Sequence, residues 1–171
     1  PMARAIIDTY TSFCVGDSGV SYTVSNPEVQ VVVDEFWEDP RNNLASIQEL
    51  LLRDQLIMGE TLLEMLVGAG SGVVRFSPLD TTSVHDVVNL RGNPLWPDKI
   101  VFEPGAEDLK VVAVDDATGL RDGRAMWWTP NKTLVTDKRS MPFLMPVLDW
   151  LDSYDTVLSN LIDRTALARY M

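Results

Sequence analysis

Several kinds of residue are scarce in this chain of 171 residues, and each scarcity excludes a class of protein. Cys14 is the only cysteine, so an internal disulfide and a metal site with several cysteine ligands are both excluded. No apolar run approaches the length of a membrane span, and the first residues lack a signal-peptide pattern. We therefore expect a cytoplasmic protein that is not secreted and has no membrane partner.

Basic residues are also few, with 14 Lys and Arg against 25 Asp and Glu and a net charge of -11. A protein that clamps nucleic acid neutralises phosphates with basic side chains, so this balance argues against a clamp. It does not exclude a protein past which DNA slides. The hydrophobic content of 46% predicts a soluble, globular chain with a true core.

Two amphipathic helices are expected before residue 40. The first follows the helical period over residues 2–13, and the glycines within 16–19 end it before a strand-like run at 20–24. The second begins at a capping box in which Ser25 caps the helix, with Pro27 in the first helical position.

A third helix is expected over residues 43–58. Either Asn42 or Asn43 can cap it, while Ser46 with Glu49 also fits a capping box, so two starting points are open. Its predicted core face consists of Leu44, Ile47, Leu50, Leu51, Ile57 and Met58.

Asp54 falls inside that predicted core face, where a lone carboxylate is costly to bury. One interpretation is a structural acid bound to backbone amides or to an arginine. The other is a proton donor with a perturbed pKa.

Gly59 is expected to end the third helix in a left-handed conformation. Strands at 61–67 and 73–77 follow, joined by the glycine loop 68–72, and Pro78 is expected to stop the second strand. The loop superficially resembles a phosphate cradle, but it lacks the Lys-Ser/Thr of a P-loop and leads into a strand. It is therefore interpreted as a hairpin turn.

A β-rich region punctuated by proline and glycine comes next. Its expected strands are 84–89, 99–103, 109–115, 125–129 and 133–136. Ser83, His85 and Asp86 are not expected to form a catalytic triad, because neighbours on one strand point to opposite faces. Asp115 and Asp116 lack the spaced oxygens of a calcium site and predict a solvated turn.

Trp127 and Trp128 are adjacent in an expected strand, so their side chains point to opposite sides. If one enters the core, the other is exposed or lies at an interface, where aromatic residues are common.

From Ser140 onward the helical period returns. The apolar stripe consists of Leu144, Val147, Leu148, Leu151, Tyr154, Leu158, Leu161, Ile162 and Thr165. The opposite, acidic face carries Asp149, Asp152, Thr156, Ser159, Asn160 and Asp163. Such a face either meets solvent or lines something. Because the pattern is still strong at Met171, we expect a fragment of a longer protein.

These elements predict an α+β fold with three parts. They are a helical and hairpin lobe at 1–88, a β-rich lobe at 89–139 and a long amphipathic helix at 140–171.

Five stretches, in this order and at this spacing, resemble one family. They are Ala3-Arg-Ala-Ile-Ile-Asp-Thr-Tyr10, Val33-Asp-Glu-Phe-Trp37, the run 50–60 ending in Ile57-Met-Gly-Glu60, Val74-Arg-Phe-Ser-Pro-Leu-Asp80 and Leu144-Met-Pro-Val-Leu-Asp-Trp-Leu-Asp-Ser-Tyr-Asp155. Together they are similar to the portal proteins of tailed bacteriophages, the rings through which DNA enters and leaves the capsid.

The resemblance implies a dodecameric ring whose subunits have a wing, a clip, a stem and a crown. Residues 1–88 would be wing, 89–139 would include the clip, and the helix from Ser140 would belong to the stem. No second long helix precedes the β-rich lobe, so one stem helix is expected to be short or absent, and the tunnel loop and crown would be expected after Met171.

The resemblance also implies partners and location. A portal sits at a capsid vertex of the virion, is assembled in the host cytoplasm, and binds the terminase packaging motor and the capsid and head-completion proteins. It has no catalytic residue, metal or cofactor, and double-stranded DNA passes through it without sequence-specific binding.

Residue roles follow as hypotheses. The channel-facing residues are Asp149, Asp152, Thr156, Asn160 and Asp163, and Trp127 or Trp128 lies at the subunit interface. Two alternatives remain open: a monomeric adaptor domain, or a metal-dependent nuclease that uses Asp149 and Asp152, or Asp115 with Asp116.

Overall fold

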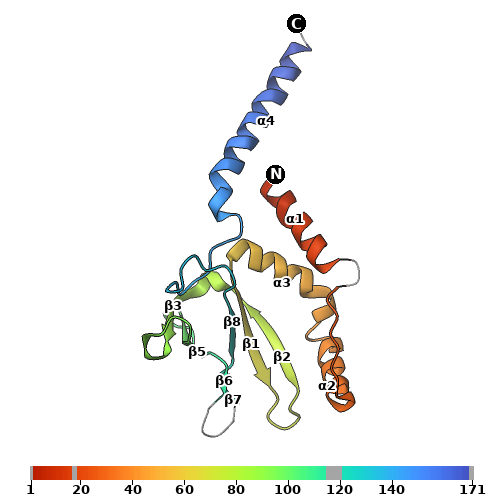
Figure 1. Ribbon diagram of the computed structural model, residues 1–171, viewed down its shortest axis with the longest axis vertical. Helices are drawn as coiled ribbons and strands as arrows, with labels where there is room; N and C mark the ends of the chain where they lie inside the picture. The colour runs from red at the N-terminus through yellow and green to blue at the C-terminus, as the bar shows by residue number, and fades with distance from the viewer. Residues whose placement is uncertain (1, 17–18, 115–120, 170–171) are drawn as a thin grey trace.

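The computed structural model describes residues 2–16, 19–114 and 121–169, and it confirms the α+β class. A β-rich body carries helices along one side, and one long helix extends away from it (Figure 1). The helices are α1 (Met2–Val15), α2 (Pro27–Glu38), α3 (Leu44–Met58) and α4 (Leu148–Ala168).

The first sheet has the strand order β2-β1-β8. β1 (Thr61–Val67) and β2 (Val74–Leu79) form the predicted antiparallel hairpin, and β8 (Ala125–Trp128) pairs with the other side of β1. Pro78 does not stop the second strand, because it lies inside β2 opposite Leu63. An edge strand tolerates proline where the missing N–H would face outward.

The second sheet has the order β3-β4-β5. Its strands are β3 (Val84–Asn89), β4 (Pro97–Phe102) and β5 (Leu109–Lys110). The strand predicted at 109–115 is divided, because its later part, β6 (Ala113–Val114), pairs with β7 (Arg121–Asp122). The strand predicted at 133–136 is wrong, since Leu134 and Asp137 close a turn there.

One hydrophobic core joins the two sheets. Its buried members are Leu62, Val84, Val87, Ile100, Leu109 and Ala125. The predicted boundary between the two lobes, at residues 88 and 89, falls inside β3. Residues of both predicted lobes contribute to this core. The hairpin and the β-rich region therefore pack as one unit.

A second, smaller core lies among the helices. Ile7 of α1, Leu56 of α3 and Leu144 are buried together, with Leu52 and Leu151 packed against them. This contact orients α3 differently from the prediction.

The predicted core face of α3 is therefore wrong in part. Leu50, Ile57 and Met58 are exposed. Asp54 is also exposed, because it lies about 200° around the helix from Leu52, which packs inward. The expected burial of Asp54 is thus wrong.

The start of α2 differs from the prediction as well. Asn26, and not Ser25, is the N-cap, and its side chain accepts a bond from the Glu28 amide, while Pro27 occupies the first helical position as predicted. The run at 20–24 is not a strand. It lies beside α2, where the Tyr22 hydroxyl donates to Asp34 at 2.8 Å.

Tyr22 provides a test of this arrangement. Partial burial, the hydrogen bond to Asp34 and the nearby charges of Asp34 and Glu38 raise the pKa of Tyr22 to about 12. Because the folded pKa exceeds the unfolded value of about 10, the stability contributed is complete below pH 10 and is lost as pH rises toward 12. Phenolate absorbance of the wild type minus Tyr22→Phe should show a midpoint near 12, and one near 10 would contradict the contact.

Asn42 connects α2 to the hairpin. It is 3% exposed; its amide donates to the Phe36 and Val74 carbonyls, and its oxygen accepts from the Phe76 amide. Asn42→Ala leaves three backbone groups without these partners, so we expect a loss of about 2 kcal/mol in the free energy of unfolding, measured by urea titration. Asn93→Ala removes a single solvent-facing bond to the Leu95 amide and should cost less than about 1 kcal/mol. Equal losses would show that Asn42 has no connecting role.

Candidate functional site

The segment before α4 is fixed to the body by a partly buried ion pair. Glu60 follows Gly59 at the end of α3 and is 2% exposed. Arg139 donates to Glu60 Oε1 from Nε at 2.6 Å and also from Nη2. The same guanidinium donates to the carbonyls of Thr81 and Val84, at 2.9 and 3.1 Å. Arg139 therefore connects α3, the second sheet and the segment that leads into α4.

Further contacts hold the segment that follows Arg139 in the sequence. The Phe143 amide donates to the Leu56 carbonyl at 2.9 Å, and Leu144 is buried beside Leu56. A Cβ on Gly59 would meet the Met141 carbonyl carbon at 2.5 Å, so glycine is required by this crossing as well as by its φ of 86°. The base of α4 is thus rigidly placed.

The start of the last helix differs from the prediction. Residues 140–144 are not helical, a 3₁₀ turn (Met145–Val147) follows, and α4 begins at Leu148 instead of Ser140. The reason is local: Met141 and Phe143 use their amides in bonds to Asn131 and Leu56, which a helix would not allow.

Beyond its first turn α4 leaves the body, and none of its 21 residues is fully buried. It extends to the C-terminal end of the molecule, with α1 beside only its base (Figure 1). All the predicted channel-facing residues are exposed, namely Asp149, Asp152, Thr156, Asn160 and Asp163. At 100° per residue they share one face, about 80° wide. The Thr156 hydroxyl donates to the Asp152 carbonyl in its own helix.

The opposite face of α4 is apolar and is also exposed. Ile162 is 67% exposed and Leu161 is 53% exposed. A shallow groove of about 360 Å³ runs between Leu158, Ile162 and Ala166. A second groove of about 510 Å³ lies between α1 and α4, lined by Ile6, Trp150 and Tyr154 among others. This apolar surface has no cover within the described part of the chain.

The two predicted interface tryptophans lie in β8 and differ in exposure. Trp127 packs against the main core, with the Arg139 guanidinium 5.5 Å from its ring centroid. Trp128 is 62% exposed. The predicted alternation is confirmed, and Trp128 is the exposed member of the pair.

The residues considered for catalysis do not converge. His85 and Asp86 are both exposed on β3. Asp86 pairs with Lys138 at 2.7 Å, and this hydrogen bond lowers the pKa of Asp86. Asp115 and Asp116 lie outside the described residues. Among residues 2–16, 19–114 and 121–169, no three His, Cys, Asp or Glu side chains gather as metal ligands would.

Sequence reasoning missed the Glu60–Arg139 pair, which is the main ionic contact of the site. The two residues are 79 positions apart. The only local signal was an acid directly after a helix-ending glycine, and that signal does not identify its partner.

Comparisons with known proteins leave the resemblance untested. Neither a protein-family model nor a curated protein matches this sequence. In the described residues, no helix combines the length and apolar character needed to cross a bilayer.

Proposed function

We propose that this chain is a subunit of a ring-shaped portal of a tailed bacteriophage, in which α4 borders the DNA channel. The observation that carries the proposal is the exposure of α4 on both of its faces while its base is firmly anchored. Beyond its first turns, where it contacts α1 and the small core, this helix packs on nothing in the described part of its own chain, and it therefore gains its further stabilising contacts from another molecule.

The apolar face of α4 supplies the driving force for assembly. Burying a large aliphatic side chain contributes about 1.5–3 kcal/mol. Leu158, Leu161 and Ile162 are all exposed, and the groove beside Trp150 can receive a neighbouring helix. Closed rings use head-to-tail contacts of this kind, repeated by one rotation.

The acidic face suits a channel wall. Duplex DNA carries one negative charge per about 1.7 Å, and basic walls hold it by releasing counterions. Asp149, Asp152 and Asp163 repel phosphates instead, so DNA can move in both directions without adhering. On this proposal the partners are other copies of the chain, the terminase motor, the capsid and head-completion proteins, and DNA bound without sequence preference at the capsid vertex of the virion.

Neutralising the acidic face tests the channel role. The variant D149N/D152N/D163N is expected to form normal rings but to slow packaging or ejection of DNA several-fold in assembled particles, because the wall then repels phosphates less. The control E49Q/D54N/E103Q removes the same charge from exposed positions on the body and should behave as the wild type. Unchanged DNA transport in the first variant would contradict the channel role.

A further inference from the structure

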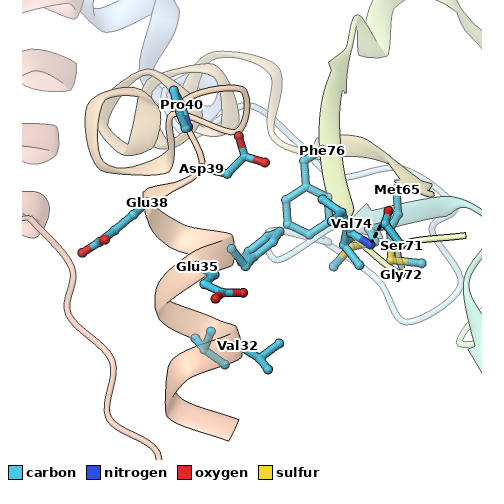
Figure 2. Close-up of a pocket in the computed structure, with 14 residues that line it drawn as sticks. Val32, Glu35, Glu38, Asp39, Pro40, Met65, Ser71, Gly72, Val74 and Phe76 are labelled. Atoms are coloured by element: carbon cyan, nitrogen blue, oxygen red, sulfur yellow. Dashed lines mark hydrogen bonds between the residues drawn. The ribbon is translucent and has the colours of Figure 1, made fainter. Parts of the chain in front are cut away.

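An apolar groove of about 770 Å³ separates α2 from the β1–β2 hairpin. Figure 2 shows Val32 and Glu35 of α2 on one side and Val74 and Phe76 of the hairpin on the other. Met65 and Met126 add further apolar lining. Three acidic residues line it, Glu35, Glu38 and Asp39. The Glu38 carboxylate points away from the hairpin (Figure 2) and Asp39 pairs with Arg75 at 3.8 Å, so Glu35 is the carboxylate that faces the groove. The groove therefore fits an apolar group that carries a positive charge.

The groove is held open by contacts at one end. Asn42 fastens the end of α2 to β2 through its bonds to Phe36, Val74 and Phe76. The rings of Phe36 and Phe76 meet edge to face, with centroids 5.1 Å apart. An occupant thus meets a preformed surface, which lowers the entropic cost of binding.

A loop with the complementary character lies between β3 and β4. Leu90, Leu95 and Trp96 are 48%, 62% and 55% exposed. Arg91 stands among them, exposed, and forms no ion pair with the described residues. We call residues 90–96 the knob loop.

The knob loop is rigid despite its exposure. The Leu90 amide donates to the Trp96 carbonyl at 2.7 Å, and the Asn93 amide donates to the Leu90 carbonyl at 3.0 Å. The Asn93 side chain also accepts from the Leu95 amide. The loop therefore presents a tryptophan and two leucines in a fixed arrangement, as the central contact residues of an interface do.

β3, which leads into the knob loop, and α2 lie on opposite sides of the β1–β2 hairpin (Figure 1), and the groove lies between the hairpin and α2. A feature and its complement on opposite sides cannot meet within one chain, and between chains they form a head-to-tail contact. We infer that the knob loop of one subunit inserts into the α2–hairpin groove of the next subunit. This inference rests on the proposed ring and names one of its contacts.

Charge and shape both favour this contact. In this contact Arg91 faces Glu35, while Trp96 and Leu95 cover Val32 and Phe36. A single loop buries less than the roughly 1,000 Å² that a stable interface needs. The apolar face of α4 supplies the remainder, so the knob contact sets the register of neighbouring subunits.

Disulfide crosslinking of the full-length protein tests the contact. In a Cys14→Ser background, the pair L95C with V32C should give a ladder of covalent oligomers on oxidation. The control pair L95C with L134C should give no such ladder. Leu134 is 61% exposed and Val32 is 63% exposed, so the two positions are equally accessible. Each single-cysteine variant should stay monomeric on a denaturing gel, because a head-to-tail contact brings unlike residues together.

Charge reversal gives a second measurement. Arg91→Glu should weaken assembly about tenfold or more, since like charges then face each other, and combining it with E35R should restore assembly. If rings form but neither pair crosslinks and Arg91→Glu assembles normally, the knob contact is wrong and the proposed function stands. If the wild type forms no ring, the proposed function fails, and a ladder from L95C with V32C would then show only that the two surfaces meet.

Discussion

Replacing Arg139 with alanine is expected to lower the free energy of unfolding by about 3 kcal/mol. The change leaves the Glu60 carboxylate, which is 2% exposed, without its main partner, and breaking a buried ion pair costs about 3–5 kcal/mol. The Arg139 side chain is itself 40% exposed, so solvent screening places the effect at the lower end of that range. In a chain of this size the melting temperature should fall by about 6–12 °C.

The adjacent residue provides a matched control. Lys138 also pairs with an acid far away in the sequence, Asp86, but both side chains are about half exposed. Lys138→Ala should therefore cost less than about 1 kcal/mol. Chemical unfolding of the three proteins under one set of conditions makes the comparison. If R139A and K138A lose the same small amount, Arg139 does not anchor the segment before α4.

Placing a charge on the apolar face of α4 is expected to abolish assembly without affecting the fold. Ile162→Asp removes an apolar contact and puts a carboxylate in its place, which should weaken each subunit contact at least about a hundredfold. Ile162 is 67% exposed in the single chain, so the stability of the monomer should change by no more than about 0.5 kcal/mol.

Asn160→Asp is the control for this change. It adds the same charge two positions away, on the acidic face of α4. Native mass spectrometry should show oligomers of the wild type and of N160D, and monomers of I162D. Equal assembly of all three proteins would show that the apolar face of α4 is not buried between subunits.

Short-range sequence patterns predicted the elements that depend mainly on interactions between residues close together in the sequence. The helical period located α1 to α3, and the glycine loop located the hairpin. Pro27 marked the first helical position of α2. Each of these signals acts over a few residues, so the sequence alone contains it.

Tertiary contacts decided the features that the sequence did not reveal. The helical period predicts Asp54 on the core face, but it does not determine which side of α3 packs against Leu144. The last helix begins late because Met141 and Phe143 bind distant backbone atoms. Glu60 and Arg139 are 79 positions apart, so only the tertiary fold brings them together. The candidate channel residues share one helical face, which the spacing did predict, but their role depends on neighbouring molecules.

Electron microscopy of the purified full-length protein tests the central claim most directly. Chains that bury the exposed apolar face of α4 against one another should appear as rings with a central hole. A field of single, compact particles of monomer size at all protein concentrations, as a monomeric adaptor would give, would contradict the account.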